Sequence, residues 1–184
     1  MRVIAGIYKR SNLYTLDGND TRPTRDMVKE ALFSSIDINE NTSFLDLFSG
    51  SGSIGIEAIS RGSKEVIFND LNPEAVEIIK KNLNKFNENR IVYNLDYLRC
   101  LEKCVMNNNI FDYIYIDPPY DFNHYEDIIS YISNNSLLKG SGRIIVETKK
   151  DKDLKEEIED LILYKVKKYG ITKLNYYRYK YLDE

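Results

Sequence analysis

The sequence has little of the residue types on which several kinds of site depend. Its 184 residues include one histidine, His124, and two cysteines. With a single histidine we expect neither a Ser-His-Asp triad nor a histidine-based metal site. Cys100 and Cys104 lie four apart with no second pair or histidine cluster nearby, and zinc needs about four ligands, so we predict a buried structural pair and no metal.

Long apolar runs and proline are also scarce. No run approaches the roughly 18 apolar residues of a membrane span, and the N-terminal segment does not resemble a secretory signal, so we expect a cytoplasmic protein with no membrane partner. Four prolines, 42% hydrophobic and 30% charged residues are typical of one folded domain. We expect a monomer.

Basic residues are concentrated at the two ends of the chain, although the net charge is −3. That net charge argues mildly against a protein that coats nucleic acid with its whole surface. Each basic group is either solvated surface or a face that contacts phosphates. The groups are Lys9, Arg10, Arg22 and Arg25 near the N-terminus, and Lys165, Lys167, Lys168, Lys173, Arg178 and Lys180 near the C-terminus.

From residue 43 onward, short apolar runs alternate with amphipathic stretches, which is typical of β-α-β units on a largely parallel sheet. The clearest helix is 72–86, because Asn72 is a good N-cap and Pro73 suits the first helical position. Two β-rich runs joined at Tyr169-Gly170 predict a closing antiparallel hairpin. The predicted strands are 44–48, 65–69, 91–94, 111–116, 143–147, 161–169 and 172–181, and the other helices are 54–61, 97–105 and 124–133.

The first 40 residues are predicted to form an extension on the sheet domain of residues 41–184. Residues 2–8 and 13–15 alternate like a small β-hairpin, and residues 25–35 have the periodicity of a helix. Glu57, in the helix at 54–61, is most simply a surface or capping side chain.

A glycine-rich segment follows the first predicted strand. Residues 46–55 read DLFSGSGSIG, and glycine there permits positive φ and lets a ligand lie against bare backbone. Because Asp70 falls 20 residues after Gly50, the spacing also satisfies the dinucleotide fingerprint of a nicotinamide oxidoreductase. Asp46 favours another ligand, since a carboxylate there would bind the cationic amino group of a methionine moiety and would repel a pyrophosphate.

The other acids of this region each have two interpretations. Asp70 suits a ribose diol or caps the turn before Asn72, and Asp96 either accepts from an adenine amino group or is the N-cap of the following helix. Asp46 itself could be only a turn acid. The predicted cofactor site comprises Asp46, Phe48, Gly50, Gly52, Asp70, Leu71 and Asp96.

The strand at 111–116 runs directly into Asp117-Pro118-Pro119-Tyr120. In open α/β sheets the ligand crevice lies at the carboxyl ends of the strands, so this segment should lie next to the glycine loop. Consecutive prolines hold the backbone rigid, and the Asp117 carboxylate and the Pro118 carbonyl could then both accept from one NH₂ group. Tyr120 offers a flat face for a base taken out of its stack. Alone, the segment could be merely a stiff turn; in combination with the glycine loop and its acids it predicts catalysis on an amine.

These motifs resemble those of class I methyltransferases that methylate amines, and most closely those of the RsmD family, the 16S rRNA guanine-N2 methyltransferases. The resemblance covers almost the whole chain and includes TRPT at 21–24, GIEAISRG at 55–62 and KYG at 168–170. In the hairpin the family usually carries a basic-Gly-basic string, where this chain has Tyr8-Lys9-Arg10-Ser11. The basic character is kept and the glycine is not, so the hairpin geometry and the docking of RNA are expected to differ.

The resemblance implies a Rossmann-like α/β fold with a seven-stranded, mostly parallel sheet. It also implies S-adenosylmethionine as cofactor, bound at positions that include Asp46, Gly50, Gly52 and Asp70, and catalysis at Asp117, Pro118, Pro119 and Tyr120. The implied substrate is one guanine of small-subunit rRNA, presented in an assembling ribosomal particle. We predict that Lys9, Arg10, Arg22 and Arg25 contact RNA phosphates outside the cofactor cleft.

Three other functions fit parts of the pattern. An adenine or cytosine amino-methylase acting on DNA would use the same Asp-Pro-Pro-Tyr chemistry, although it generally needs a substantial target-recognition region. A nicotinamide-dependent oxidoreductase fits the glycine spacing and is disfavoured by Asp46. An inactive RNA-binding module would have no reason to keep both motifs.

Overall fold

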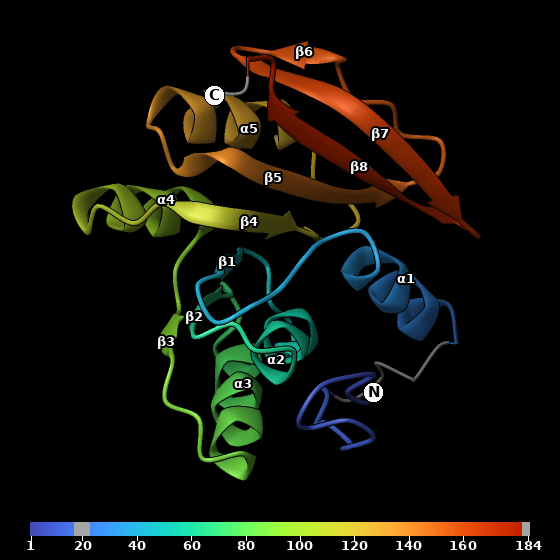
Figure 1. Cartoon of the computed structure of the whole chain (residues 1–184), viewed down its shortest axis with the longest axis vertical. Helices are drawn as coiled ribbons and strands as arrows, with labels where there is room; N and C mark the ends of the chain where they lie inside the picture. The colour runs from blue at the N-terminus through green and yellow to red at the C-terminus, as the bar shows by residue number, and fades with distance from the viewer. Residues whose placement is uncertain (17–22, 182–184) are drawn as a thin grey trace.

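The computed structural model describes residues 1–16 and 23–181 and builds them around one eight-stranded sheet (Figure 1). No helix in these residues is long and apolar enough to cross a membrane. The strands are β1 (Ser43–Asp46), β2 (Glu65–Asn69), β3 (Ile91–Tyr93), β4 (Phe111–Ile116), β5 (Leu138–Lys149), β6 (Glu157–Ile158), β7 (Leu161–Tyr169) and β8 (Thr172–Tyr179). The helices are α1 (Pro23–Phe33), α2 (Ser53–Ser60), α3 (Pro73–Lys85), α4 (Tyr97–Met106) and α5 (Tyr125–Asn134).

The strand order is β3-β2-β1-β4-β5-β8-β7-β6. The pairs from β3 to β5 are parallel, and β8, β7 and β6 add antiparallel pairs at one edge. The Rossmann-like class and the closing hairpin at Tyr169-Gly170 are therefore confirmed. The count of seven strands is one too low, because the two-residue β6 pairs with β7 and is too short to show an apolar pattern in the sequence.

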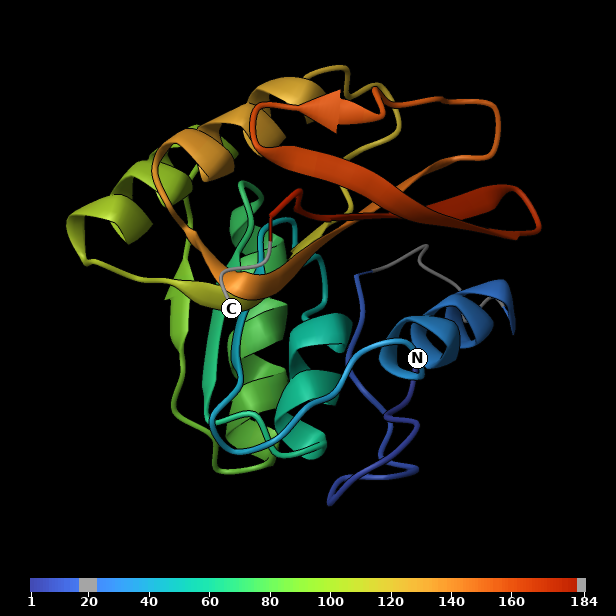
Figure 2. The same cartoon turned by 45° about the horizontal axis from the view of Figure 1, so that its top comes forward.

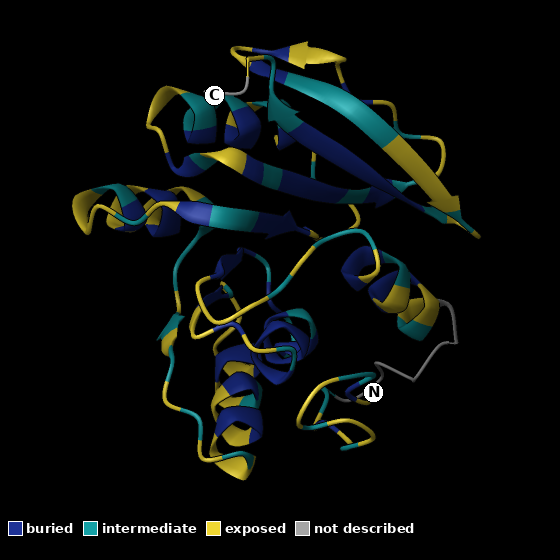
Figure 3. Ribbon diagram, viewed as in Figure 1, coloured by how far each residue is buried: buried dark blue, intermediate teal, exposed yellow. Residues whose placement is uncertain are grey.

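Helices cover both faces of the sheet, so neighbouring residues of one strand enter different cores (Figures 1 and 2). Leu45 and Ile114 pack with α4 and α5, whereas Phe44 and Tyr115 pack with α1, α2 and α3. This two-sided burial explains why the central strands are nearly continuous apolar runs. Figure 3 shows the same strands as the most buried part of the molecule. Cys100 and Cys104 lie fully buried in the first of these cores.

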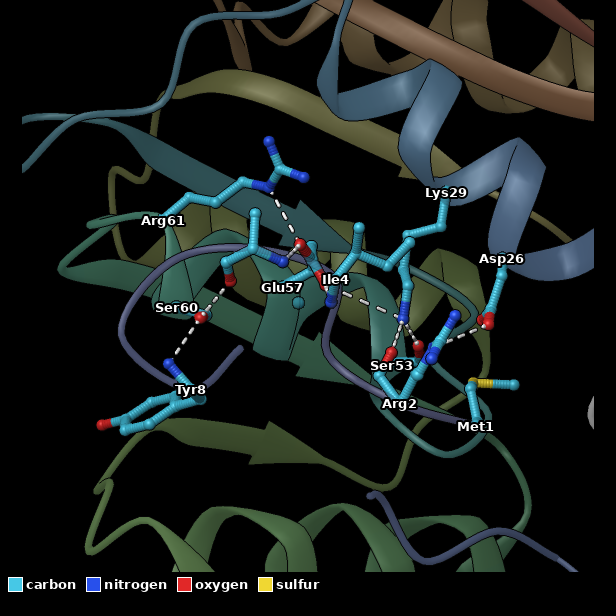
Figure 4. A network of polar contacts seen from close by, with 12 residues as sticks. Met1, Arg2, Ile4, Tyr8, Asp26, Lys29, Ser53, Glu57, Ser60 and Arg61 are labelled. Atoms are coloured by element: carbon cyan, nitrogen blue, oxygen red, sulfur yellow. Dashed lines mark hydrogen bonds and ion pairs between the residues drawn. The ribbon is translucent and has the colours of Figure 1, made fainter. Parts of the chain in front are cut away.

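The predicted N-terminal hairpin is present in short form: Arg2 and Asn12 form an antiparallel bridge, and Val3 N donates to Ser11 O and Leu13 N to Met1 O, both at 2.9 Å. Other backbone N–H groups of the segment donate to α2. Ile4 and Ala5 donate to the Glu57 carboxylate at 2.8 and 2.9 Å, and Tyr8 donates to Ser60 Oγ at 3.0 Å (Figure 4). The segment is thus fixed both to its returning strand and to α2.

The turn nevertheless keeps a glycine-like shape. Arg10 has φ 70°, in the left-handed region that favours glycine, and its N–H donates to Val3 O at 2.9 Å. A non-glycine residue there costs on the order of 1 kcal/mol. Arg10 therefore keeps a basic side chain at the turn at the expense of backbone strain.

Glu57 is fully buried, so its interpretation as a surface or capping residue is wrong. Its carboxylate lies 2.9 Å from Arg61 Nε and 3.7 Å from Lys29 Nζ, and it also accepts the two N-terminal N–H groups (Figure 4). Lys29 donates in turn to Arg2 O and to Ser53 Oγ, which ties α1 to the first residue of α2. Burial lowers the pKa of Lys29, while the Glu57 charge raises it. One carboxylate thus connects the N-terminal segment, α1 and α2.

We predict that Glu57→Ala lowers the free energy of unfolding by about 3–5 kcal/mol, because it leaves the Lys29 ammonium buried and two backbone donors unpaired. Urea denaturation at neutral pH measures the change. Glu77→Ala, which removes the exposed i,i+3 pair with Lys80, is the matched control and should cost less than about 1 kcal/mol. Equal losses in the two variants would contradict the structural role of Glu57.

Candidate active site

One cavity of about 880 Å³ lies where the carboxyl ends of β1, β2, β4 and β5 meet. That position agrees with the rule for open α/β sheets, and the volume is within the usual range of ligand sites. Segments predicted separately from the sequence meet there. The predicted residues that line the cavity are Asp46, Phe48, Gly50, Asp70, Leu71, Asp96, Asp117, Pro118, Pro119 and Tyr120.

The glycine loop turns through two left-handed residues, Gly50 at φ 55° and Gly52 at φ 79°. Gly50 lines the cavity, and its N–H donates to Asp70 Oδ2 at 2.8 Å. Gly52 faces the core, where an added Cβ would lie 3.1 Å from Ile79 Cγ1. The loop conformation therefore needs both glycines, but Gly50 is the one that opens the backbone to a ligand.

Asp46 is 1% exposed, and only one of its two carboxylate oxygens accepts a hydrogen bond from the described residues. Its Oδ2 accepts from Gly55 N at 3.1 Å, whereas no donor from the described residues reaches the buried Oδ1. Burial raises the pKa of Asp46 to about 7, and the nearby Asp70 charge adds to the effect, while the hydrogen bond from Gly55 opposes it. A buried carboxylate oxygen with no donor, in the wall of a cavity, fits a ligand that supplies a cationic donor.

Asp70 and Asp96 each had two interpretations from the sequence, and the structure shows the capping one. Asp70 Oδ1 accepts from Asn72 N at 2.9 Å, and Asp96 is the N-cap of α4, accepting from Leu98 N and Arg99 N at 3.0 and 3.1 Å. Both capping interpretations are confirmed. Both acids also line the cavity, and a carboxylate oxygen has a second lone pair for a ligand.

Aromatic rings form the apolar wall beside Asp96. Phe122 lies 5.4 Å from Phe48, 5.3 Å from Tyr97 and 5.2 Å from Tyr125, measured between ring centroids. Neither Phe122 nor Tyr97 was predicted from the sequence to belong to the site. Only their positions in the sequence could have indicated that they belong to the site, because Phe122 comes two residues after Tyr120 and Tyr97 directly follows Asp96.

A second carboxylate, Glu147 of β5, accompanies Asp117. The parallel register pairs Ile116 with Val146. The next residues, Asp117 directly after β4 and Glu147 within β5, therefore lie side by side on adjacent strands. Asp117 is open to the cavity and enclosed elsewhere by protein; this loss of solvation, with the Glu147 and Asp46 charges, raises the pKa of Asp117 well above its usual value. Burial also raises the pKa of Glu147, and the charge of Arg25 lowers the pKa of both acids.

Tyr120 presents a ring that is 69% exposed, at the mouth of the cavity. The Lys149 ammonium lies 3.5 Å from the ring centroid, within cation–π range. One face of the ring is therefore in contact with a cation, and Lys149 and Tyr120 also line a second hollow of about 560 Å³ with Lys150 and Lys168. Lys149 was not predicted from the sequence to lie at the site.

The predicted RNA-contacting residues are not in one place. Lys9 and Arg10 lie exposed on the N-terminal turn, and Arg22 lies outside the described residues. Arg25 was predicted to lie outside the cofactor cleft; that placement is wrong, because Arg25 lines the cavity and acts on the Asp117 and Glu147 charges. Arg25 is exposed in the third position of α1 and lies at the cavity.

Several C-terminal basic residues have partners within the chain. Lys165 lies 4.6 Å from the Tyr176 ring and Arg178 lies 4.9 Å from the Tyr164 ring. Lys173 is 3% exposed and pairs with Asp153, and Lys180 pairs with Glu157. For these four residues the structure supports packing and pairing on the hairpin.

Comparisons with known proteins agree with this geometry. A family model described as conserved hypothetical protein 95 matches residues 1–178. The chain is 38% identical to ribosomal RNA small subunit methyltransferase D of Haemophilus influenzae, covering 97% of this chain and 93% of that protein. It is 35% identical to YlbH of Bacillus subtilis, provisionally named an rRNA methyltransferase, over 97% and 98% of the two chains.

The solved structure of yhhF of Escherichia coli, provisionally named a methyltransferase, superposes with a TM-score of 0.83 at 26% identity over 97% of both chains. The chain therefore belongs to the conserved hypothetical protein 95 family, the RsmD family that its motifs indicated.

Proposed function

We propose that this protein transfers a methyl group from S-adenosylmethionine to the exocyclic N2 amine of a guanine in small-subunit rRNA. The observation that carries the proposal is that Asp117-Pro118-Pro119-Tyr120 opens into the same cavity as Asp46, Gly50 and Asp70. An amine-binding segment and a cofactor-binding loop thus face one space. Relatives named as rRNA methyltransferases over nearly the whole chain support the rRNA substrate.

The residues present fit S-adenosylmethionine. Asp46 Oδ1 would accept from the methionine ammonium, Asp70 from the ribose hydroxyls and Asp96 from the adenine amino group, with Phe48 and Leu71 packing beside them. The cofactor supplies an electrophilic methyl group on a sulfonium. A nicotinamide nucleotide fits less well, because its pyrophosphate would meet the Asp46 carboxylate.

Asp117 and the Pro118 carbonyl would hold the two hydrogens of the amine and so direct its lone pair toward the methyl group. A base amine is a poor nucleophile because its lone pair is delocalised, and fixed acceptors stabilise the positive charge that develops on nitrogen during transfer. The raised pKa of Asp117 also suits it to take the proton that the amine must lose. Tyr120 would stack on the base.

The target itself rests on the family. Guanine N2 is the amine that the RsmD resemblance implies, and an assembling small-subunit particle is the form in which we expect the rRNA to be bound, by a monomer in the cytoplasm. Small-subunit particles from a strain that lacks the enzyme, incubated with the purified protein and labelled cofactor, provide the test. N2-methylguanosine among the digested nucleosides would support the proposal. N6-methyladenosine or N4-methylcytosine would instead support the alternative amino-methylases.

We predict that affinity for S-adenosylhomocysteine falls about 15-fold from about pH 7 to about pH 5.5. Asp46 can bind the ammonium only as a carboxylate, and with a pKa of about 7 its ionised fraction decreases through this range. Isothermal titration calorimetry at the two pH values measures the effect, and Asp46→Asn should bind weakly at both without the pH dependence. A wild-type affinity that does not change between them would contradict the assignment of Asp46.

We predict that Asp117→Ala lowers the rate of methyl transfer about 10²–10³-fold and leaves S-adenosylhomocysteine affinity nearly unchanged, because Asp117 acts on charge that appears only in the transition state. Tyr120→Ala should weaken capture of the base, whereas Tyr120→Phe should be tolerated, since the ring provides the stacking face. Single-turnover assays on the particles separate the two effects. Wild-type rates in folded Asp117→Ala protein would show that the amine-holding mechanism is wrong.

We also predict that replacing Lys9, Arg10 and Arg22 with alanine flattens the salt dependence of RNA binding, by about 0.7 in slope for each phosphate that the variant no longer binds. Cofactor affinity should not change. The control is a Lys64→Ala, Lys80→Ala variant, which removes exposed lysines that pair with Glu40 and Glu77. If both variants show the wild-type slope, the N-terminal basic residues are ordinary surface.

A further inference from the structure

We propose that Glu147 forms, with Asp117, a subsite for the Watson–Crick edge of guanine, in which Glu147 accepts from the base N1–H while Asp117 holds the N2 amine. This inference rests on the proposed function and deepens it, because it names the residue that selects the base. Glu147 lies outside the Asp-Pro-Pro-Tyr segment, and the mechanism proposed for that segment gives it no role.

The first support is the placement of the two carboxylates. Asp117 follows β4 and Glu147 lies near the end of β5, one position beyond the Ile116–Val146 pair, and neighbouring strands are about 4.8 Å apart. Both residues line the cavity. The two hydrogen-bonding groups of guanine that they would meet, N1–H and N2–H₂, are on adjacent ring atoms, so two carboxylates on adjacent strands can bind one edge.

The second support is how Glu147 is held. The Tyr115 hydroxyl donates to Glu147 Oε2, and Tyr115 is itself 2% exposed in the core that α1, α2 and α3 cover. Glu147 also interacts with Thr172 at the start of β8. A carboxylate fixed from two sides presents its remaining lone pairs in a defined direction, as a base-recognition group must.

The third support is the balance of charge in the cavity. Burial raises the pKa of Asp46, Asp117 and Glu147, and the Glu147 and Asp46 charges raise the pKa of Asp117 further. The positive charge of Arg25 lowers the pKa of Asp117 and Glu147. Asp46 Oδ1, buried without a donor from the described residues, shows independently that this cavity is built for a donor-rich ligand. The methionine ammonium would satisfy Asp46, which leaves the other two carboxylates for the substrate.

Of the amine-bearing bases, only guanine satisfies this pair. Guanine presents a donor at N1 beside its amine, whereas adenine N1 and cytosine N3 beside their amines are acceptors. An acceptor lone pair facing an ionised Glu147 would be repelled, and a buried carboxylate would be left without a donor. The arrangement of Asp117 and Glu147 therefore favours guanine over the bases of the alternative amino-methylases.

The test uses 2-aminopurine, which keeps the 2-amine of guanine and has an acceptor at N1. Small-subunit particles are reconstituted with rRNA that carries either guanine or 2-aminopurine at the nucleotide that wild-type protein methylates. We expect wild-type kcat/KM to be about 100-fold higher for guanine. Glu147→Gln should reduce this preference below about 10-fold, because the amide NH₂ can donate to N1 of 2-aminopurine.

Two further variants separate recognition from structure. Glu147→Asp should lose rate on guanine and keep the preference, because it retains the carboxylate. Tyr115→Phe should reduce the preference by less than Glu147→Gln does, because it loosens Glu147 but leaves its carboxylate in place. S-adenosylhomocysteine affinity within about twofold of wild type shows that each variant is folded. A wild-type preference in Glu147→Gln, or the same loss of preference in Tyr115→Phe, would overturn the proposal. Absence of N2-methylguanosine with wild-type protein would overturn the proposed function instead, before any variant is compared.

Discussion

The parallel pairing of β1 with β4 is the constraint on which the site depends. The register aligns Asp46 with Tyr115, and Leu47 N donates to Tyr115 O at 3.1 Å, so pairing continues past the end of β1. The chain then leaves β1 into the glycine loop and leaves β4 into Asp117, with the two loops next to each other. Because β2 lies on one side of this pair and β5 on the other, the four strand ends bring Asp46, Asp70, Asp117 and Glu147 to one cavity. A register shift of one residue would turn Asp46 and Tyr115 to the opposite faces.

Concentrating carboxylates in this way destabilises the fold near neutral pH. With a pKa of about 7, against about 3.9 in the unfolded chain, Asp46 favours the protonated form on folding. Its contribution is neutral below about pH 4, becomes unfavourable as pH rises from about 4 to about 7, and reaches about 4 kcal/mol above that. A cationic ligand that donates to Asp46 Oδ1 offsets this cost. The cost of burying this carboxylate and its affinity for a cation therefore have one cause, the loss of solvation at Asp46.

The local elements and the principal motifs could be predicted from the sequence because short-range signals determine them. Asn72-Pro73 fixed the start of α3, and the Asn72 side chain accepts from Glu74 N as an N-cap should. Asp46 ends a buried strand, and Gly50 and Asp117 come shortly after buried strands. Their common location could be predicted because ligands of open α/β sheets bind at the carboxyl ends of the strands. Glu57 could not be read in this way, because a glutamate on an amphipathic helix gives no sign that a segment 52 or 53 residues away in sequence will bury it. Glu147 was missed for a similar reason, since its importance comes from the register of β5 against β4.

The buried Glu57 also connects the N-terminal extension to the elements that line the cavity. Lys29 contacts Glu57, Arg2 O and Ser53 Oγ, and Ser53 lies between Gly52 and Gly55 at the start of α2. One turn earlier on the same helix, Arg25 lines the cavity and acts on Asp117 and Glu147. Helix α1 therefore contacts the first residue of α2 with the Lys29 side chain and lowers the pKa of Asp117 and Glu147 with the Arg25 side chain. Because the backbone of Ile4 and Ala5 is hydrogen-bonded to Glu57, the same carboxylate that holds Lys29 also fixes the N-terminal segment to α2. The N-terminal extension and the helix that carries Arg25 are thus joined through one buried ion pair.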